Sequence, residues 1–171
     1  WQRTLATVER HIRTALDAAA KSDWKATHEA LEPVRIELMA ARQRQGMDYF
    51  VDRLTAYHAP MEVLALAGAT LKPVQLDAAR RAQLEQAYAE ARALWRGIEQ
   101  QPLDAAAYGL SAARQAQLRK ALDDETAALA RLSDALRGSE FDTLLKAAQA
   151  IKPPFSRAFT AFGKAEGESA L

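Results

Sequence analysis

The residue types best suited to binding a transition metal are concentrated near the start of this 171-residue chain. All three histidines and all three methionines lie within the first 61 residues: His11, His28, His58, Met39, Met47 and Met61. His58, Met61 and Glu62 are spaced three and four residues apart, which places them on one side of a helix. Imidazole with thioether favours copper, whereas imidazole with carboxylate favours zinc or iron. This segment therefore predicts a transition-metal site.

Two turns in the sequence could bring a third helix to the same site. A chain reversal at Ser22 and another at Gly46 would make three antiparallel helices, with residues 11 and 58 at a similar level along them. The candidate metal ligands are then His58, Met61, Glu62 and His11, with His28 as an outer member.

The same residues also fit a buried polar network that holds no metal. In the expected hairpin Arg35 lies opposite His58, and its charge repels a cation unless Glu32 or Glu62 engages it. A buried histidine is usually hydrogen-bonded to a neighbouring group, and methionine commonly fills gaps in a core. The members of this network are Arg35, Arg42, Glu32 and Glu125. Both interpretations stay open.

Glu125 stands out because it interrupts a stripe of leucines. The apolar face of its helix contains Leu118, Leu122, Leu129, Leu132 and Leu136, with Glu125 in their midst. A buried carboxylate is costly unless it is paired or protonated. We expect Arg35, Arg42 or one of the histidines to be its partner. The alternative is a small rotation of the helix that exposes Glu125 and buries Ala121 or Ala128.

Several well-known kinds of site are missing from the sequence. The chain has no cysteine, which excludes disulfides, thiolate metal sites and covalent haem attachment. No histidine follows a glutamate at the spacing of a di-iron bundle, and His28-Glu29 lacks the second histidine of a zincin helix. No glycine-rich phosphate loop or serine nucleophile elbow is present. We therefore expect no enzyme, while non-covalent haem held by His58 or Met61 stays open.

The elements that must position these residues are all helices. Apolar residues recur every three or four positions, and no run alternates as a strand would. We expect five long helices at about 2–21, 23–46, 48–67, 77–98 and 111–137, and two short ones at 139–151 and 155–162. Together they predict one all-α domain over residues 1–171, an antiparallel helical bundle with a four-helix-bundle-like core, in which 163–171 is a frayed tail.

Charge and composition narrow the partners and the compartment. The 23 Lys and Arg nearly balance the 22 Asp and Glu, and both signs alternate along the helices, which disfavours nucleic-acid binding. The longest apolar stretch, 63–71, is about half of the roughly 20 residues that a membrane-spanning helix needs. The absence of cysteine and a first residue other than Met lead us to expect an exported, periplasmic protein whose signal peptide was removed.

These observations favour a non-enzymatic, exported helical-bundle binding protein. The first hypothesis is coordination of a copper, zinc or iron ion for storage, delivery or sensing. The second is a structural or protein-interaction module in which the same residues only connect the helices and the partner is another protein. The third is a bundle that binds haem non-covalently.

Overall fold

The computed structural model describes residues 1–162, and these form an all-α fold, as the apolar spacing predicts. The helices are α1 (Gln2–Ala20), α2 (Trp24–Arg44), α3 (Phe50–Thr70), the 3-10 turn η1 (Pro73–Gln75), α4 (Ala78–Glu99), α5 (Ala112–Arg137), α6 (Phe141–Gln149) and α7 (Lys152–Thr160). The expected tail 163–171 lies outside the described residues.

Polar caps and left-handed turns set the helix boundaries. Asp23 accepts a hydrogen bond from the Ala26 amide (3.0 Å) at the start of α2, and Asp77 does the same for Arg80 (2.8 Å) at the start of α4. Ser111 caps α5 in the same way. These side chains satisfy amides that have no partner within the helix. Gly46, with φ of +66°, follows α2 in the left-handed region that glycine adopts without strain.

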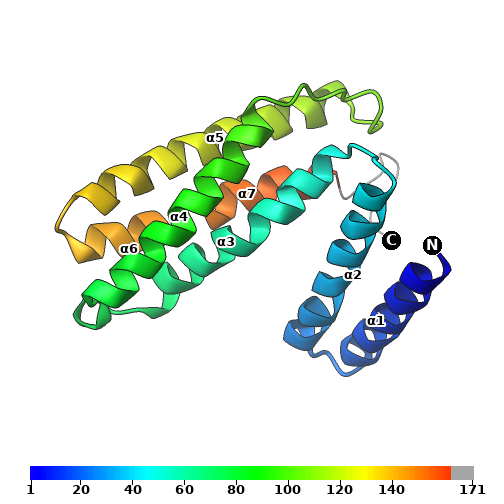
Figure 1. The fold of residues 1–171 in the computed structure, drawn as a ribbon, viewed down its shortest axis with the longest axis horizontal. Helices are drawn as coiled ribbons and strands as arrows, with labels where there is room; N and C mark the ends of the chain where they lie inside the picture. The colour runs from blue at the N-terminus through cyan, green and yellow to red at the C-terminus, as the bar shows by residue number, and fades with distance from the viewer. Residues whose placement is uncertain (163–171) are drawn as a thin grey trace. The chain divides into compact units, whose positions relative to one another are not determined.

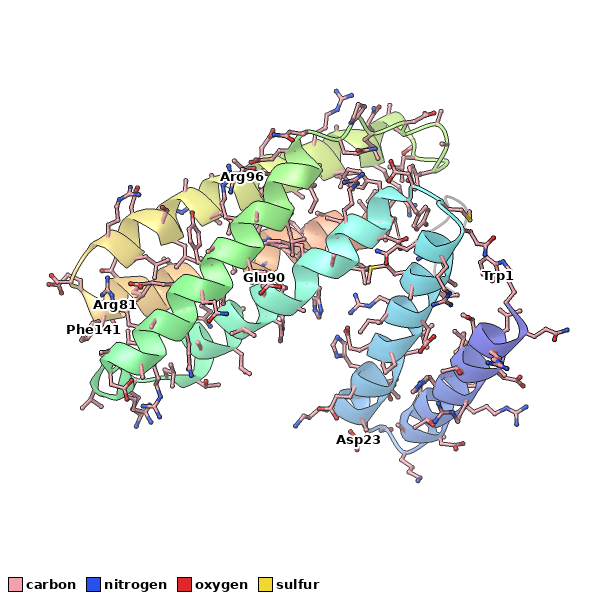
Figure 2. The ribbon with its side chains drawn as sticks, in the orientation of Figure 1. Trp1, Asp23, Arg81, Glu90, Arg96 and Phe141 are labelled. Atoms are coloured by element: carbon pink, nitrogen blue, oxygen red, sulfur yellow. The ribbon has the colours of Figure 1, made fainter. Side chains whose placement is uncertain are left out.

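The chain divides into two compact units, residues 1–55 and residues 56–171, where the sequence leads us to expect one domain. The first unit contains α1 and α2, which pack as an antiparallel hairpin (Figure 1). Figure 2 shows Trp1 at the start of α1 and Asp23 at the turn before α2. The buried residues of the two helices are Thr4, Val8, Ala15 and Ala41.

The large apolar side chains along this hairpin are exposed: Leu5, Ile12, Leu16, Trp24 and Leu31. The physical reason is that a two-helix hairpin gives each helix only one packed side.

The end of α2 is fixed to the start of α3 by a charged pair. The Arg42 guanidinium donates to both carboxylate oxygens of Asp52, with Nε at 2.9 Å from Oδ2. Its carbon also lies 4.6 Å from the centre of the Tyr49 ring. A bidentate pair of this kind orients both side chains, and it raises the pKa of Arg42 because the Asp52 carboxylate favours the charged guanidinium.

The second unit is a helical bundle with a continuous core. In Figure 1, α6 and α7 follow one another back along α5. The largest fully buried apolar side chains come from α3, α4, α5, α6 and the residue that joins α6 to α7: Tyr57, Met61, Leu64, Trp95, Leu118, Leu129, Leu132, Leu144 and Ile151. The predicted bundle core is therefore formed in this unit.

A glycine lets α3 approach the end of α6 at backbone distance. A Cβ placed on Gly68 would lie 2.5 Å from the Gln149 amide nitrogen and 2.5 Å from the Leu145 carbonyl oxygen. No other residue type fits this contact without moving one of the two backbones. The short helix α7 then begins with two prolines in its first turn, where a missing amide hydrogen costs nothing.

Arg81 connects α4 to the turn between α5 and α6. Its guanidinium donates to the backbone carbonyl of Leu136 and to that of Gly138 (3.0 Å). These carbonyls belong to the last turn of α5 and to the residue after it. Carbonyl groups at this end of a helix receive no hydrogen bond from an amide of the same helix. A cationic side chain at a helix C-terminus also favours the helix dipole. In Figure 2, Arg81 and Phe141 lie at the same end of the unit.

Among the described residues, none of the helices combines the length and hydropathy needed to cross a membrane.

Candidate functional site

The first predicted metal ligands are neighbours on α3 in the second unit. The His58 Nε2 atom lies 4.0 Å from Oε2 of Glu62, and Met61 is fully buried beside them. The His58 ring packs against Phe155 with 5.5 Å between ring centres. The other oxygen of Glu62 accepts a hydrogen bond from the Lys152 ammonium at 2.9 Å. A lysine at this point places a positive charge beside the predicted metal ligands.

The other two histidines belong to the first unit. His11 is half-buried on α1, and His28 is exposed on α2 with its Nε2 atom 3.3 Å from Glu32. Within residues 1–162, no group of three or more His, Asp or Glu side chains is arranged to hold a metal ion. The predicted set of His58, Met61, Glu62, His11 and His28 therefore stays a hypothesis.

The predicted polar network is divided into separate pairs. Arg35 pairs with Glu32 one turn away on α2, and Arg42 pairs with Asp52. Glu125 is completely buried on α5, so the rotation that would expose it does not occur. The partner expected for Glu125 is wrong: the hydroxyl of Tyr57 on α3 donates a hydrogen bond to Glu125 Oε1. Arg35, Arg42 or a histidine was expected as this partner.

The Tyr57–Glu125 pair lies within an aromatic cage. The Tyr57 ring centre is 4.8 Å from that of Trp95 and 5.6 Å from that of Phe155. Burial raises the pKa of Glu125 to about 8, although the Tyr57 hydrogen bond and the charge of Arg157 oppose the shift. Burial and the neighbouring carboxyl also raise the pKa of Tyr57. The second oxygen of Glu125 has no hydrogen-bond partner among the described residues.

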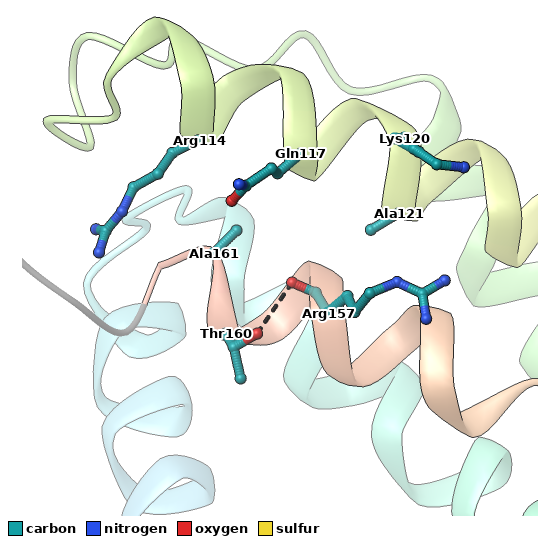
Figure 3. A pocket seen from close by; sticks show the side chains of 7 residues that line it. All are labelled: Arg114, Gln117, Lys120, Ala121, Arg157, Thr160 and Ala161. Carbon is teal, nitrogen blue, oxygen red and sulfur yellow. Dashed lines mark hydrogen bonds between the residues drawn. The ribbon is translucent and has the colours of Figure 1, made fainter.

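A cleft that could hold a small ligand lies between α5 and α7. Its volume is about 740 Å³, within the range of about 300–1,000 Å³ that small-molecule sites occupy. The lining residues are Arg114, Gln117, Lys120, Ala121, Arg157, Thr160 and Ala161. The cleft exists because small alanines face each other where the two helices pack. Figure 3 shows Arg114 towards one end of the cleft and Lys120 and Arg157 towards the other.

The charges at the two ends of the cleft differ in their pairing. At one end Asp124 accepts from the Lys120 ammonium at 3.0 Å and from the Arg157 guanidinium at 3.0 Å. Lys120 and then Arg157 hold the pKa of Asp124 below its ordinary value. Two cations around one carboxylate leave a net charge of +1 at this end. At the other end lies Arg114, which forms no ion pair with an acidic side chain of residues 1–162.

The lining of the cleft offers groups that can bind a ligand. Its lining contains cations, an amide, a threonine and alanines, and the Thr160 hydroxyl already donates to the Arg157 carbonyl at 3.2 Å. Asp124, the carboxylate next to it, is engaged by two cations and is therefore a weak base. No nucleophile lies beside a general base among these residues. The arrangement can attract an anion and cover its apolar part.

The cleft was not predicted, although the spacing of its lining residues in the sequence indicates it. Arg114, Gln117 and Ala121 recur at three and four residues on α5, and Arg157 and Ala161 do so on α7. A polar stripe that contains a small residue on each of two helices can indicate a groove between them. Only the packing of the two helices shows that the stripes face each other.

Comparison with known proteins gives no assignment: no family model matches, and neither the curated proteins nor the solved structures contain a match to this chain.

Proposed function

We propose that this chain is a non-enzymatic binding protein whose cleft between α5 and α7 takes an organic anion with an acidic group at each end. The observation that carries the proposal is that cationic side chains stand at both ends of a cleft whose middle is lined by alanines. Ala121 and Ala161 suit an aliphatic segment. Arg114 suits one carboxylate, and Arg157 with Lys120 suits the other.

The helix geometry sets the expected length of the ligand. Arg114 and Lys120 are six residues apart on α5, which corresponds to about 9 Å along the helix axis at 1.5 Å per residue. A linear α,ω-dicarboxylate whose two carboxylates span about this distance can reach both ends at once. A monocarboxylate of the same length reaches only one end, so it should bind more weakly.

The test is calorimetric titration of the protein with a series of α,ω-dicarboxylates of increasing chain length. We expect an optimum length, and weaker binding of the monocarboxylate and of the uncharged diol with the same number of carbons. Replacing Arg114→Gln should weaken the best dicarboxylate about tenfold, since a charge-assisted hydrogen bond contributes roughly 1.5–3 kcal/mol. Arg157→Gln should weaken binding at least as much, because it removes a cation from the cleft and also the bond from Arg157 to Asp124.

Arg119→Gln is the matched control, because Arg119 is an exposed arginine of the same helix outside the cleft lining. It should leave the affinity unchanged. A series without a length optimum, or equal weakening by the Arg114 and Arg119 variants, would overturn the proposal.

One observation favours the metal hypothesis as a second candidate. The Glu62 oxygen that faces His58 is buried and accepts no hydrogen bond from a described residue. A metal ion bound there would have to tolerate the Lys152 ammonium, which opposes it electrostatically. Metal analysis of untagged protein, followed by copper and zinc titration of the His58→Ala variant, tests this candidate. Equal metal content in the variant would remove His58 from any such site.

A further inference from the structure

The α1–α2 hairpin exposes a group of large apolar side chains. They are between 40% and 70% exposed, and we call them the hairpin face: Trp1, Leu5, Ile12, Leu16, Trp24 and Leu31. Isolated exposed leucines are ordinary on a protein surface, but a group that includes two tryptophans is not. The question is whether these residues lie together and what covers them.

Helix geometry places the five members of the hairpin face that lie within α1 and α2 on one side of the hairpin. On α1, positions 5, 12 and 16 lie on the same flank of the line by which Thr4, Val8 and Ala15 contact α2. On α2, Trp24 and Leu31 are seven residues apart and form a parallel stripe. Both stripes are rotated in the same sense from the contact line, and in antiparallel neighbours this puts them on the same side. Ile12 and Leu31 are then level with each other.

The size of the hairpin face is that of an interface. From their exposed fractions, the six side chains present on the order of 700 Å² of surface, whereas the largest apolar patch of a typical monomer covers about 300–600 Å². A standard interface buries about 800 Å² on each partner. Within the described part of the second unit, the large exposed apolar side chains are only Val63, Leu66, Val74 and Phe141. They come from three elements and do not provide a matching surface.

We propose that the hairpin face is a homodimer interface, in which the α1–α2 hairpins of two copies pack face to face as a four-helix arrangement. A two-helix unit is too small to bury its own apolar stripe, and a second identical hairpin supplies the missing layer. A two-fold axis makes the face complementary to itself, which is the commonest geometry of homo-oligomers. Trp1 and Trp24 are the residue type that most often dominates interface energy.

The charges beside the hairpin face permit this packing. Glu9 pairs with Arg13 on α1, and Arg35 pairs with Glu32 on α2, so each helix neutralises charge on its own flank of the face. Bringing two copies together therefore places no large block of one charge against itself.

Sedimentation velocity of the full chain across protein concentrations tests the proposal. We expect a concentration-dependent dimer, weakened at least tenfold by Ile12→Glu and by Trp24→Ser. Both side chains are exposed in the single copy, so circular dichroism of the variants should keep the helical signal. The matched control is Val74→Glu, an exposed apolar residue outside the hairpin face, which should leave the dimer intact.

Three outcomes would overturn the proposal. One is a wild-type protein that stays monomeric at high concentration. Another is a dimer that Ile12→Glu and Trp24→Ser do not weaken. The third is a monomer that floats with lipid vesicles through the same residues, which would assign the face to a membrane surface. None of these results depends on whether the cleft binds a dicarboxylate.

Discussion

The α1–α2 hairpin and α5 carry comparable apolar stripes but bury them to different extents. The two helices of the hairpin together contribute four buried residues, whereas α5 alone contributes eight, including the carboxyl group of Glu125. The difference lies in the number of neighbours, since α5 packs against α4, α6 and α7 and α1 packs mainly against α2. A stripe shows which side of a helix can be covered, but the neighbouring elements decide whether it is.

The largest predicted effect is a difference in unfolding free energy between the same substitution, leucine to alanine, made in α5 and in α1. Leu132→Ala removes a fully buried side chain of α5 and should cost about 2–5 kcal/mol of unfolding free energy, because a cavity is left behind. Leu16→Ala on α1 removes an exposed side chain and should change the stability of the single copy by about 0.5 kcal/mol or less. Urea denaturation followed by circular dichroism, at a concentration below dimer formation, measures both. Similar losses in the two variants would contradict the comparison.

A smaller effect is expected where α3 meets α6. Gly68→Ala puts a methyl group 2.5 Å from two backbone atoms of the α6 end and should destabilise the second unit by about 1–3 kcal/mol. Gly138→Ala is the matched control, since its nearest neighbour lies at 3.5 Å and its φ of −81° suits alanine. The midpoint of thermal unfolding should fall for the first variant only. An unchanged midpoint for Gly68→Ala would mean that the two backbones are not in contact.

The third prediction concerns the pH dependence of the bundle. The folded-state pKa of Glu125 is about 8, above its ordinary value, so the folded protein holds a proton that the unfolded chain releases. This group therefore favours folding most at low pH, and its contribution is lost as the pH rises from about 4.5 to 8, by at most about 1.4 kcal/mol per pH unit. The hydrogen bond from Tyr57 and the positive charge of Arg157 oppose the rise in the pKa of Glu125 but do not change this sign.

Glu125→Gln tests this prediction, because glutamine keeps the shape and can still accept the Tyr57 hydroxyl but cannot titrate. The stability difference between variant and wild type should move in favour of the variant from pH 5 to pH 8.5. Asp123→Asn, a change at the exposed neighbouring residue, serves as the control and should show no such trend. A constant difference between the Glu125 variant and wild type would show that the carboxyl does not keep its proton.

Local features of the fold were predictable from the sequence. The helices expected at about 77–98 and 111–137 match α4 and α5 closely. Asp77 and Ser111 cap these two helices, and capping depends only on residues within one turn.

Contacts between distant segments were not predictable in the same way. Glu125 was recognisable as unusual because it interrupts a leucine stripe, but its partner Tyr57 lies 68 residues away. The cleft needed the packing of α5 on α7, which no spacing within one helix encodes. The exposure of the hairpin face was not predictable either, because a sequence shows the apolar side of a helix without showing what covers it.

The hydrogen bonds from Arg81 to the end of α5 have a consequence for motion. Because a side chain of α4 holds carbonyls of the last turn of α5, that turn cannot fray without releasing the guanidinium as well. Amide protons at the end of α5 should therefore exchange with solvent at the rate of the α4 amides around Arg81. The two helix ends would then open together as one cooperative segment.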